Sequence, residues 1–170
     1  MDKAITSAML ITISMIMVMM LFNVVYPAII EGGDTIANMT GRSQTRMSTQ
    51  IVVVHAASEL DSDGNWYDAN TLGSFEVFAW LKNVGSTRII GIDRLDVFFG
   101  PEGNYVRIPH QSETVGAFPY WTWQVENDTE WKPTATLKIT LHYSAALPST
   151  RYYLKVSTPS GVSDDYFLGM

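Results

Sequence analysis

The 170-residue chain contains no cysteine. Disulfide bonds, thiol catalysis and cysteine-ligated metal sites are therefore excluded. Basic residues are also few, with 11 Lys and Arg against 17 Asp and Glu, and they form no cluster in the sequence. Because nucleic-acid binding needs several basic side chains on one face to neutralise phosphates, this composition argues against a nucleic-acid partner.

Motifs of catalysis are missing as well. No glycine-rich phosphate loop, nucleophile elbow or pair of carboxylates stands out. The three histidines, His55, His110 and His142, are not at metal-ligand spacing from one another, and His142 is expected on the solvent face of a strand. We therefore expect neither enzymatic activity nor a cofactor.

A long apolar run, by contrast, lies close to the N-terminus, where no charged residue occurs between Ala4 and Ile30. As a helix rising ~1.5 Å per residue, this run is roughly 40 Å long, enough to cross the ~30 Å hydrocarbon layer of a bilayer. Leaving its large side chains in water would cost ~1.5–3 kcal/mol each. The run therefore predicts a helix in a membrane or in the core of a helical assembly.

The run is longer than the ~7–15-residue apolar core of a signal peptide, which favours a retained helix. Lys3 is the only basic residue before it and Arg42 the first one after it, so charge marks its orientation weakly. With the large acidic part on the C-terminal side, we expect the N-terminus inside the cell and the remainder outside.

Methionine is frequent in this run and is interspersed with serine and threonine. Methionine adapts to irregular contacts, and small residues let helices approach closely. Two interpretations stay open, a single membrane anchor and a helix that packs against copies of itself. In the second, the expected contact residues are Met9, Ile13, Met15, Met17, Val18, Met20, Leu21 and Val25.

We expect three segments: the helix over residues 1–30, a polar neck over 31–50 and a β-domain over 51–170. Pro27 should kink the helix, and Gly32 and Gly33 should weaken it. In the β-domain, apolar and polar residues alternate and turn signals recur at short intervals, which is typical of an all-β antiparallel sandwich of Ig-like architecture. The candidate strands are Ile51–Ala57, Phe75–Lys82, Ile89–Phe99, Tyr105–Pro109, Tyr120–Val125, Thr134–Tyr143, Arg151–Thr158 and Asp165–Leu168.

One loop resembles a metal site. Asp61, Asp63, Asn65 and Asp68 provide the oxygen ligands that Ca²⁺ prefers, but the bidentate glutamate of an EF-hand loop is missing. The same residue types also form a plain turn without an ion. A structural Ca²⁺ ion and a plain turn are both compatible with this sequence.

Two further features concern the surface of the β-domain. Phe78 and Trp80 should lie on the outer face of their strand, and Trp121 and Trp123 form a second aromatic group. Such residues are either covered in the core or make a lateral protein contact. N-glycosylation sequons begin at Asn127 and Asn38, and Asn127 has the more exposed loop context.

The apolar helix, polar neck and C-terminal β-sandwich together resemble archaellins and archaellum-associated proteins, whose N-terminal helix is type IV pilin-like. Two stretches resemble the FlaG group more specifically: residues 33–37 through 47–54, and residues 79–86 followed by 93–100. Pre-archaellins are typically cleaved at a Lys/Arg–Gly junction, and Lys3-Ala4 is the nearest equivalent here.

The resemblance implies first a structural subunit of an extracellular archaellum filament for motility, which polymerises through its helix. Its partners would be copies of itself, other archaellum components and, at least transiently, the cytoplasmic membrane. The alternative is a membrane-anchored, FlaG-like stator component of the same machine. A third hypothesis is an unrelated membrane-anchored β-sandwich that serves as a binding module for a ligand or for an envelope layer.

Overall fold

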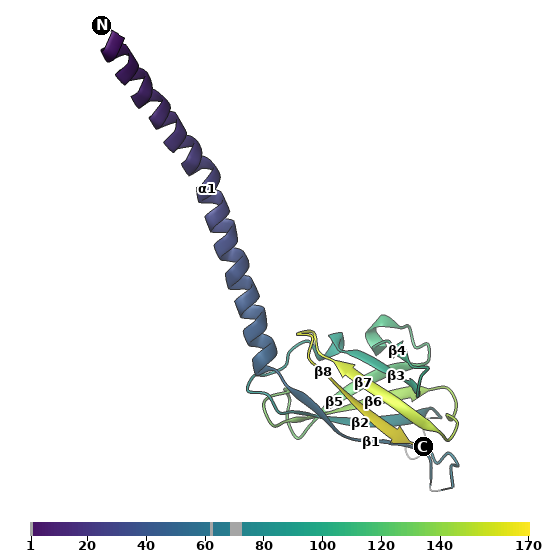
Figure 1. The fold of residues 1–170 in the computed structure, drawn as a ribbon. Helices are drawn as coiled ribbons and strands as arrows, with labels where there is room; N and C mark the ends of the chain where they lie inside the picture. Colours follow the sequence, from purple (N-terminus) through teal and green to yellow (C-terminus); the bar gives the residue numbers. More distant parts are fainter. Residues whose placement is uncertain (1, 62, 69–72) are drawn as a thin grey trace. The chain divides into compact units, whose positions relative to one another are not determined.

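A computed structural model describes residues 2–61, 63–68 and 73–170. The chain divides into two compact units, Met1–Gln44 and Thr45–Met170. The first unit is helical, and the second is a β-sandwich that begins with the last helical turn (Figure 1). A long apolar helix followed by two antiparallel four-stranded sheets confirms the fold class expected from the sequence.

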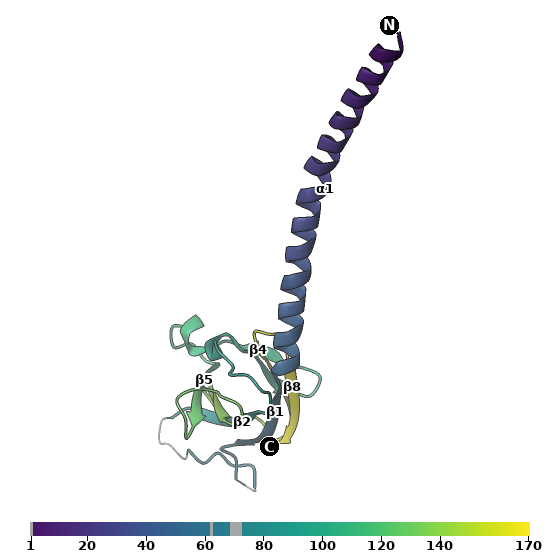
Figure 2. The ribbon, with the colours of Figure 1, turned by 90° about the vertical axis from the view of Figure 1, so that its left-hand side faces the viewer.

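Helix α1 spans Asp2–Ser48 and therefore continues far beyond the apolar run. It passes Pro27 and the Gly32-Gly33 pair without a break, and Figures 1 and 2 show only a gentle curve. Proline removes one backbone donor, and the turns on both sides keep their own hydrogen bonds. The segment expected as a separate neck is thus helical up to Ser48, although the weak helix formers glycine, serine and threonine are frequent in it, and no second proline interrupts it.

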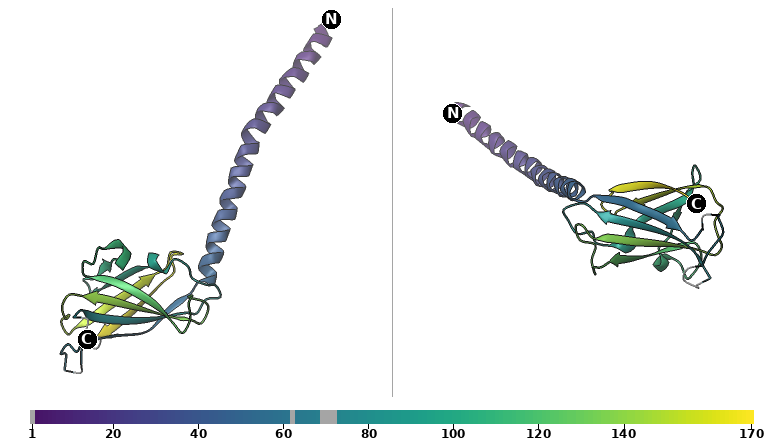
Figure 3. Two further views of the ribbon diagram at one scale, coloured as in Figure 1. Left: turned by 180° about the vertical axis from the view of Figure 1, so that it is seen from behind. Right: turned by 90° about the horizontal axis from the view of Figure 1, so that it is seen from below.

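The sandwich consists of two sheets in which all neighbouring strands are antiparallel. The strands are β1 (Ile51–Ser58), β2 (Phe75–Asn83), β3 (Asp96–Pro101), β4 (Val106–Ile108), β5 (Tyr120–Glu126), β6 (Thr136–Tyr143), β7 (Arg151–Ser157) and β8 (Ser163–Gly169). The first sheet has the order β1-β2-β6-β5, and the second has the order β4-β3-β7-β8. Figure 1 looks onto β7 and β8 of the second sheet, and the view from behind in Figure 3 looks onto β5 and β6 of the first.

The core lies between the sheets and is built from alternate residues of each strand. In β6, Leu137, Ile139 and Leu141 are all fully buried. In the facing sheet, the ring of Phe99 stacks on the ring of Tyr152, with centroids 5.2 Å apart. The alternation expected along β6 and β7 is therefore confirmed, and side chains of the other parity form the outer faces.

The strand expected over Ile89–Phe99 is shorter than predicted. Gly91 has a left-handed conformation with φ of +70°, and Ile92–Arg94 form a 3₁₀ turn before β3 begins at Asp96. Ile89, Ile92 and Leu95 are nevertheless buried. An apolar run that fills the core from an irregular segment cannot be distinguished from a strand by its composition.

Hydrogen bonds between the sheets close two edges of the sandwich. The register of β1 shifts between Val53 and His55, and the Val53 N–H donates to Asp164 Oδ2 of β8 at 2.7 Å. Figure 2 shows β1 and β8 side by side. At another edge, the Trp121 N–H donates to the Pro109 carbonyl at 3.0 Å. In both contacts a backbone N–H group at a sheet edge already has a hydrogen-bond acceptor. Unpaired N–H groups at such an edge could otherwise pair with a strand of another chain.

The last turn of α1, Thr45–Ser48, belongs to the sandwich unit and is bonded to two of its turns. The Ser48 carbonyl accepts a hydrogen bond from the Ser86 N–H at 2.9 Å. Arg46 Nε donates to the Ser160 carbonyl at 2.9 Å. The final carbonyls of a helix have no partner within the helix, and here the turn after β2 supplies one.

We expect Gly85→Ala to destabilise the sandwich. A Cβ atom at this residue would lie 2.5 Å from the Ser48 carbonyl oxygen and 2.6 Å from the Gln50 nitrogen, both backbone atoms. Overpacking of this kind costs about 1–3 kcal/mol. The loss should lower the urea midpoint of the detergent-solubilised chain.

Gly169→Ala is the matched control, because its Cβ atom would meet nothing within 4 Å. This variant should unfold close to the wild-type midpoint. Equal midpoints for the two variants would contradict the close-approach argument.

Candidate interaction surfaces

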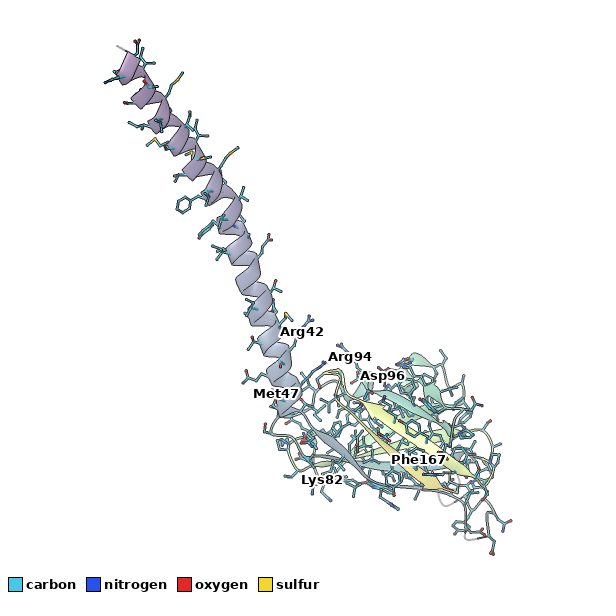
Figure 4. All side chains as sticks on the ribbon, viewed as in Figure 1. Arg42, Met47, Lys82, Arg94, Asp96 and Phe167 are labelled. Atoms are coloured by element: carbon cyan, nitrogen blue, oxygen red, sulfur yellow. The ribbon has the colours of Figure 1, made fainter. Side chains whose placement is uncertain are left out.

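The surface of α1 is apolar on all sides over its N-terminal half. No residue of α1 is buried, and Figure 4 shows side chains projecting all around it. The hydroxyls of Thr6, Ser7, Thr12 and Ser14 donate to carbonyls four residues earlier. These donors are therefore satisfied within the helix and can enter an apolar environment.

The eight residues expected in a helix bundle all lie on this exposed surface: Met9, Ile13, Met15, Met17, Val18, Met20, Leu21 and Val25. By length and composition α1 can cross a membrane, a property that N-terminal signal sequences share. Both interpretations of the helix require that lipid or other helices cover these side chains.

An aromatic patch lies on the outer face of the first sheet, which we call the Phe78–Trp80 patch (His55, Phe78, Trp80 and Lys138). The rings of Phe78 and Trp80 lie 6.1 Å apart, and the His55 ring stacks on Trp80 at 5.7 Å. Lys138 Nζ lies 4.4 Å from the centre of the Phe78 ring. Cation–aromatic contacts at exposed sites contribute about 0.5–1 kcal/mol. The rings are thus held in place beside a positive charge, and tryptophan is frequent among the residues that dominate binding energy at protein interfaces.

The tryptophans of β5 do not belong to that outer face. Trp121 pairs with Leu141 and Trp123 pairs with Ile139, and both partners are fully buried core residues. Directly opposed residues of an antiparallel pair share one face of the sheet. Trp121 is fully buried and packs in the core, so a lateral contact through it is ruled out. Trp123 lies on the inner face but reaches the surface, with 38% of its area exposed.

The outer face of the second sheet carries an aromatic stripe that the sequence analysis missed, the Tyr105–Phe167 stripe (Tyr105, Tyr153, Phe167 and Arg151). The rings of Tyr105 and Tyr153 are 4.7 Å apart, and those of Tyr153 and Phe167 are 5.0 Å apart. The Arg151 guanidinium lies 4.5 Å from the centre of the Phe167 ring. Figure 4 shows Phe167 on the side of β8 that faces the viewer.

The Tyr105–Phe167 stripe depends on Gly100 and on the register between β7 and β8. A Cβ atom on Gly100 would lie 2.6 Å from Tyr105 Cα, so only glycine lets the turn after β3 fold back over the strand. Tyr153 and Phe167 are directly opposed on β7 and β8. The alternation of Tyr153 with buried Tyr152 and Leu154 was a usable signal in the sequence, but the pairing with Phe167 was not.

Two carboxylates of the candidate Ca²⁺ loop, those of Asp61 and Asp68, accept hydrogen bonds from backbone N–H groups. Asp61 Oδ1 accepts from the backbone N–H groups of Asp63 and Asn65 at 2.9 and 2.8 Å. The Asn65 hydrogen bond is the main cause of the lowered pKa of Asp61. Asp68 Oδ2 accepts from the Gly73 N–H at 2.9 Å.

No group of three or more His, Asp and Glu side chains that could hold a metal ion occurs in the parts of the chain that the structure describes. The hydrogen bonds that Asp61 accepts are those of an Asx turn. The Ca²⁺ ion remains a prediction from the sequence alone.

His142 lies on the outer face of β6 but is covered, contrary to its expected exposure, with 12% of its side chain accessible. Its Nδ1 lies 3.1 Å from Glu76 Oε1, and its Nε2 lies 2.9 Å from Thr122 Oγ1. The Tyr120 ring stacks on the imidazole at 4.8 Å. Burial lowers the pKa of His142, and the charge of Glu59 opposes part of that shift. A neutral imidazole that donates from Nδ1 and accepts at Nε2 fits both partners.

The other two histidines have separate local contacts. His55 belongs to the Phe78–Trp80 patch. His110 Nδ1 accepts from the Ser112 N–H at the start of a 3₁₀ turn, and its ring packs edge-on against Trp121.

Both sequon asparagines are exposed, in different local structures. Asn38 lies within α1, whereas Asn127 follows β5 directly and has a left-handed conformation with φ of +58°. Asparagine tolerates this conformation better than most residues.

We expect the stability of the sandwich to decrease as the pH falls below about 6.5, the ordinary pKa of histidine. Because the pKa of His142 is lower in the folded protein, the unfolded chain binds more protons in the interval between the two values. Protonation therefore favours unfolding progressively in this range. The urea midpoint, measured from about pH 7.5 to 5, reports the effect.

His142→Gln is the comparison, since an amide can also donate to Glu76 and accept from Thr122 but does not titrate. Its midpoint should depend less on pH over the same range. An identical pH dependence in the two proteins would show that His142 is not the group responsible.

These surfaces and this fold define a class: a β-sandwich with two aromatic outer faces, preceded by a helix long and apolar enough to cross a membrane. No protein-family model matches the sequence, and no curated protein is significantly similar to it.

Some solved structures are similar to this chain. The archaellum periplasmic stator protein FlaG from Sulfolobus acidocaldarius is 28% identical with a TM-score of 0.54, and the match covers 71% of this chain and 99% of that one. A chain of the archaellum periplasmic stator protein complex FlaF and FlaG from the same organism is 29% identical with a TM-score of 0.53, covering 72% of this chain and 90% of that one. These similarities support an archaellum-related, FlaG-like protein and favour the stator alternative over the filament subunit.

Proposed function

We propose that the chain is a membrane-anchored, FlaG-like stator component of an archaellum, without catalytic activity. The observation that carries the proposal is the 28% identity to FlaG over 99% of that chain. The uncovered apolar helix supports it, because an anchor of this kind needs a segment that lipid can surround.

A stator must bind fixed structures in order to resist torque, and the sandwich offers two surfaces for this. The Phe78–Trp80 patch lies on the outer face of the first sheet, and the Tyr105–Phe167 stripe lies on the outer face of the second. Aromatic side chains and arginine are frequent among residues that dominate binding energy. One sandwich is therefore suited to contact two neighbours at once.

The partner that we infer is a FlaF-like protein, because one similar structure is a complex of FlaF and FlaG. We infer that this chain itself is located in the cell envelope, with α1 in the cytoplasmic membrane and the sandwich outside. The acidic composition does not oppose this orientation, since the positive-inside rule concerns Lys and Arg.

The filament subunit remains a second candidate for one reason. The methionine-rich surface of α1, with its internally bonded hydroxyls, also suits a bundle of identical helices. In that case the chain would polymerise, and its abundance would match that of the filament.

Fractionation of the source cells separates the two candidates. Surface appendages are sheared from the cells, and the protein is quantified by mass spectrometry in the sheared filaments and in the membranes. A stator component should remain with the membranes and be absent from purified filaments. Dominance in the filaments would overturn the proposal in favour of the filament subunit.

Within the proposed complex, we expect Trp80→Gln to weaken binding of the FlaF-like partner by roughly 30-fold or more, the effect of losing a hot-spot side chain of at least ~2 kcal/mol. The measurement is titration of the two purified proteins. Phe167→Gln, on the opposite outer face, is the control and should retain binding.

Both variants alter partly exposed side chains, so their urea midpoints should stay near that of the wild type. Loss of binding in Phe167→Gln alone would move the partner to the second sheet. Unchanged binding in both variants would exclude these two surfaces.

A further inference from the structure

The sequon at Asn127 is presented at the surface by a loop that holds itself in place. Asp128 Oδ1 accepts from the Thr129 N–H at 2.7 Å and from Lys132 Nζ at 3.2 Å. The first of these hydrogen bonds is the main cause of the lowered pKa of Asp128. The middle residue of the sequon thus stabilises the turn, while Asn127 and Thr129 are both exposed.

The two side chains that glycosylation requires are available. In the described part of the chain, neither the Asn127 amide nor the Thr129 hydroxyl makes a hydrogen bond. An exposed loop is the usual setting of an N-glycosylation acceptor. The left-handed conformation of Asn127 also ends β5, so that the acceptor lies outside the hydrogen-bond ladder.

Asn38 differs on each of these points. It lies inside α1, where its backbone is part of a continuous helix. At ~1.5 Å per residue, it is roughly 12 Å beyond Ile30 along the helix axis. A helical sequon this close to the end of the apolar run is a poor acceptor, because the transferring enzyme needs a free segment of chain at the surface.

A groove of about 280 Å³ lies beside the Asn127 loop, and Thr129 of the sequon is among its lining residues. Its lining includes two exposed apolar side chains, Ile90 at 70% and Trp123 at 38%. The apolar faces of sugar rings stack on indole, and their hydroxyls bind charged groups such as Asp93, which also lines the groove.

We propose that Asn127, and not Asn38, carries an N-linked oligosaccharide whose first sugars cover this groove. The amide nitrogen of Asn127 forms a bond to the anomeric carbon of an oligosaccharide carried on a lipid phosphate. The bond from that carbon to the phosphate oxygen breaks, the lipid phosphate leaves, and the amide loses one proton to a base. The proposal rests on the proposed function, because this transfer occurs on the outer side of the membrane.

The test uses the full-length protein purified from its own cells, in four forms: wild type, Thr129→Ala, Thr129→Ser and Asn38→Gln. Intact mass and glycopeptide mapping should show a glycan on Asn127 of the wild type and of Asn38→Gln. Thr129→Ala should lose the whole glycan mass, whereas Thr129→Ser keeps the sequon and should retain it. A wild-type chain of unmodified mass, or a glycan on Asn38 alone, would overturn the proposal.

Oxidative footprinting tests the position of the sugars. Trp121 and Trp123 occur in the same strand, but Trp121 is fully buried, so tryptophan oxidation localised to this strand by fragment-ion spectra reports on Trp123. Oxidation should increase in Thr129→Ala relative to Thr129→Ser. Equal oxidation of these two variants would overturn the placement of the glycan over the groove.

Labelling of intact cells with a membrane-impermeant amine reagent reports separately which side the sandwich occupies. A labelled but unglycosylated protein would overturn the glycan proposal and leave the proposed function intact. An unlabelled, unglycosylated protein would overturn the outward orientation on which both depend.

Discussion

The structure depends above all on the cost of exposing the apolar half of α1 to water. No residue of this helix is buried, and the sandwich already encloses a complete core of its own. Tens of kcal/mol of hydrophobic free energy must therefore be recovered from outside the chain, from lipid or from other helices. This requirement decides where the protein is located. Its contacts with other soluble partners are then left to the sandwich.

The outer faces of the sandwich, which are available for contacts with other proteins, are ordered before any partner binds. Lys138 lies over Phe78, and Arg151 lies over Phe167, so each outer face has an aromatic surface held by a cation. Side chains fixed in this way lose less conformational entropy on binding than freely rotating ones. The covered pair of Glu76 and His142 adds a polar link between neighbouring strands of the first sheet.

Much of this fold was predictable from the sequence, because local signals determined it. The uncharged run from Ala4 to Ile30 and the alternation along β6 each identified an element and its buried face. The end of α1 was not predictable, since glycine and proline weaken a helix without necessarily stopping it. The surfaces were predicted in part. Phe78 followed from alternation within one strand, whereas the burial of Trp121 depends on which strand lies opposite.

The bonded end of α1 determines how the sandwich responds to tension. After Ser48 the chain passes almost directly into β1, a strand at the edge of its sheet that pairs with β2. If β1 alone carried the tension, the hydrogen bonds between β1 and β2 would break one after another from the end of the strand. The hydrogen bonds of Ser48 to Ser86 and of Arg46 to Ser160 instead divide the tension between the turn after β2 and the turn between β7 and β8. Both sheets then share the force, because one turn follows β2 of the first sheet and the other joins β7 and β8 of the second.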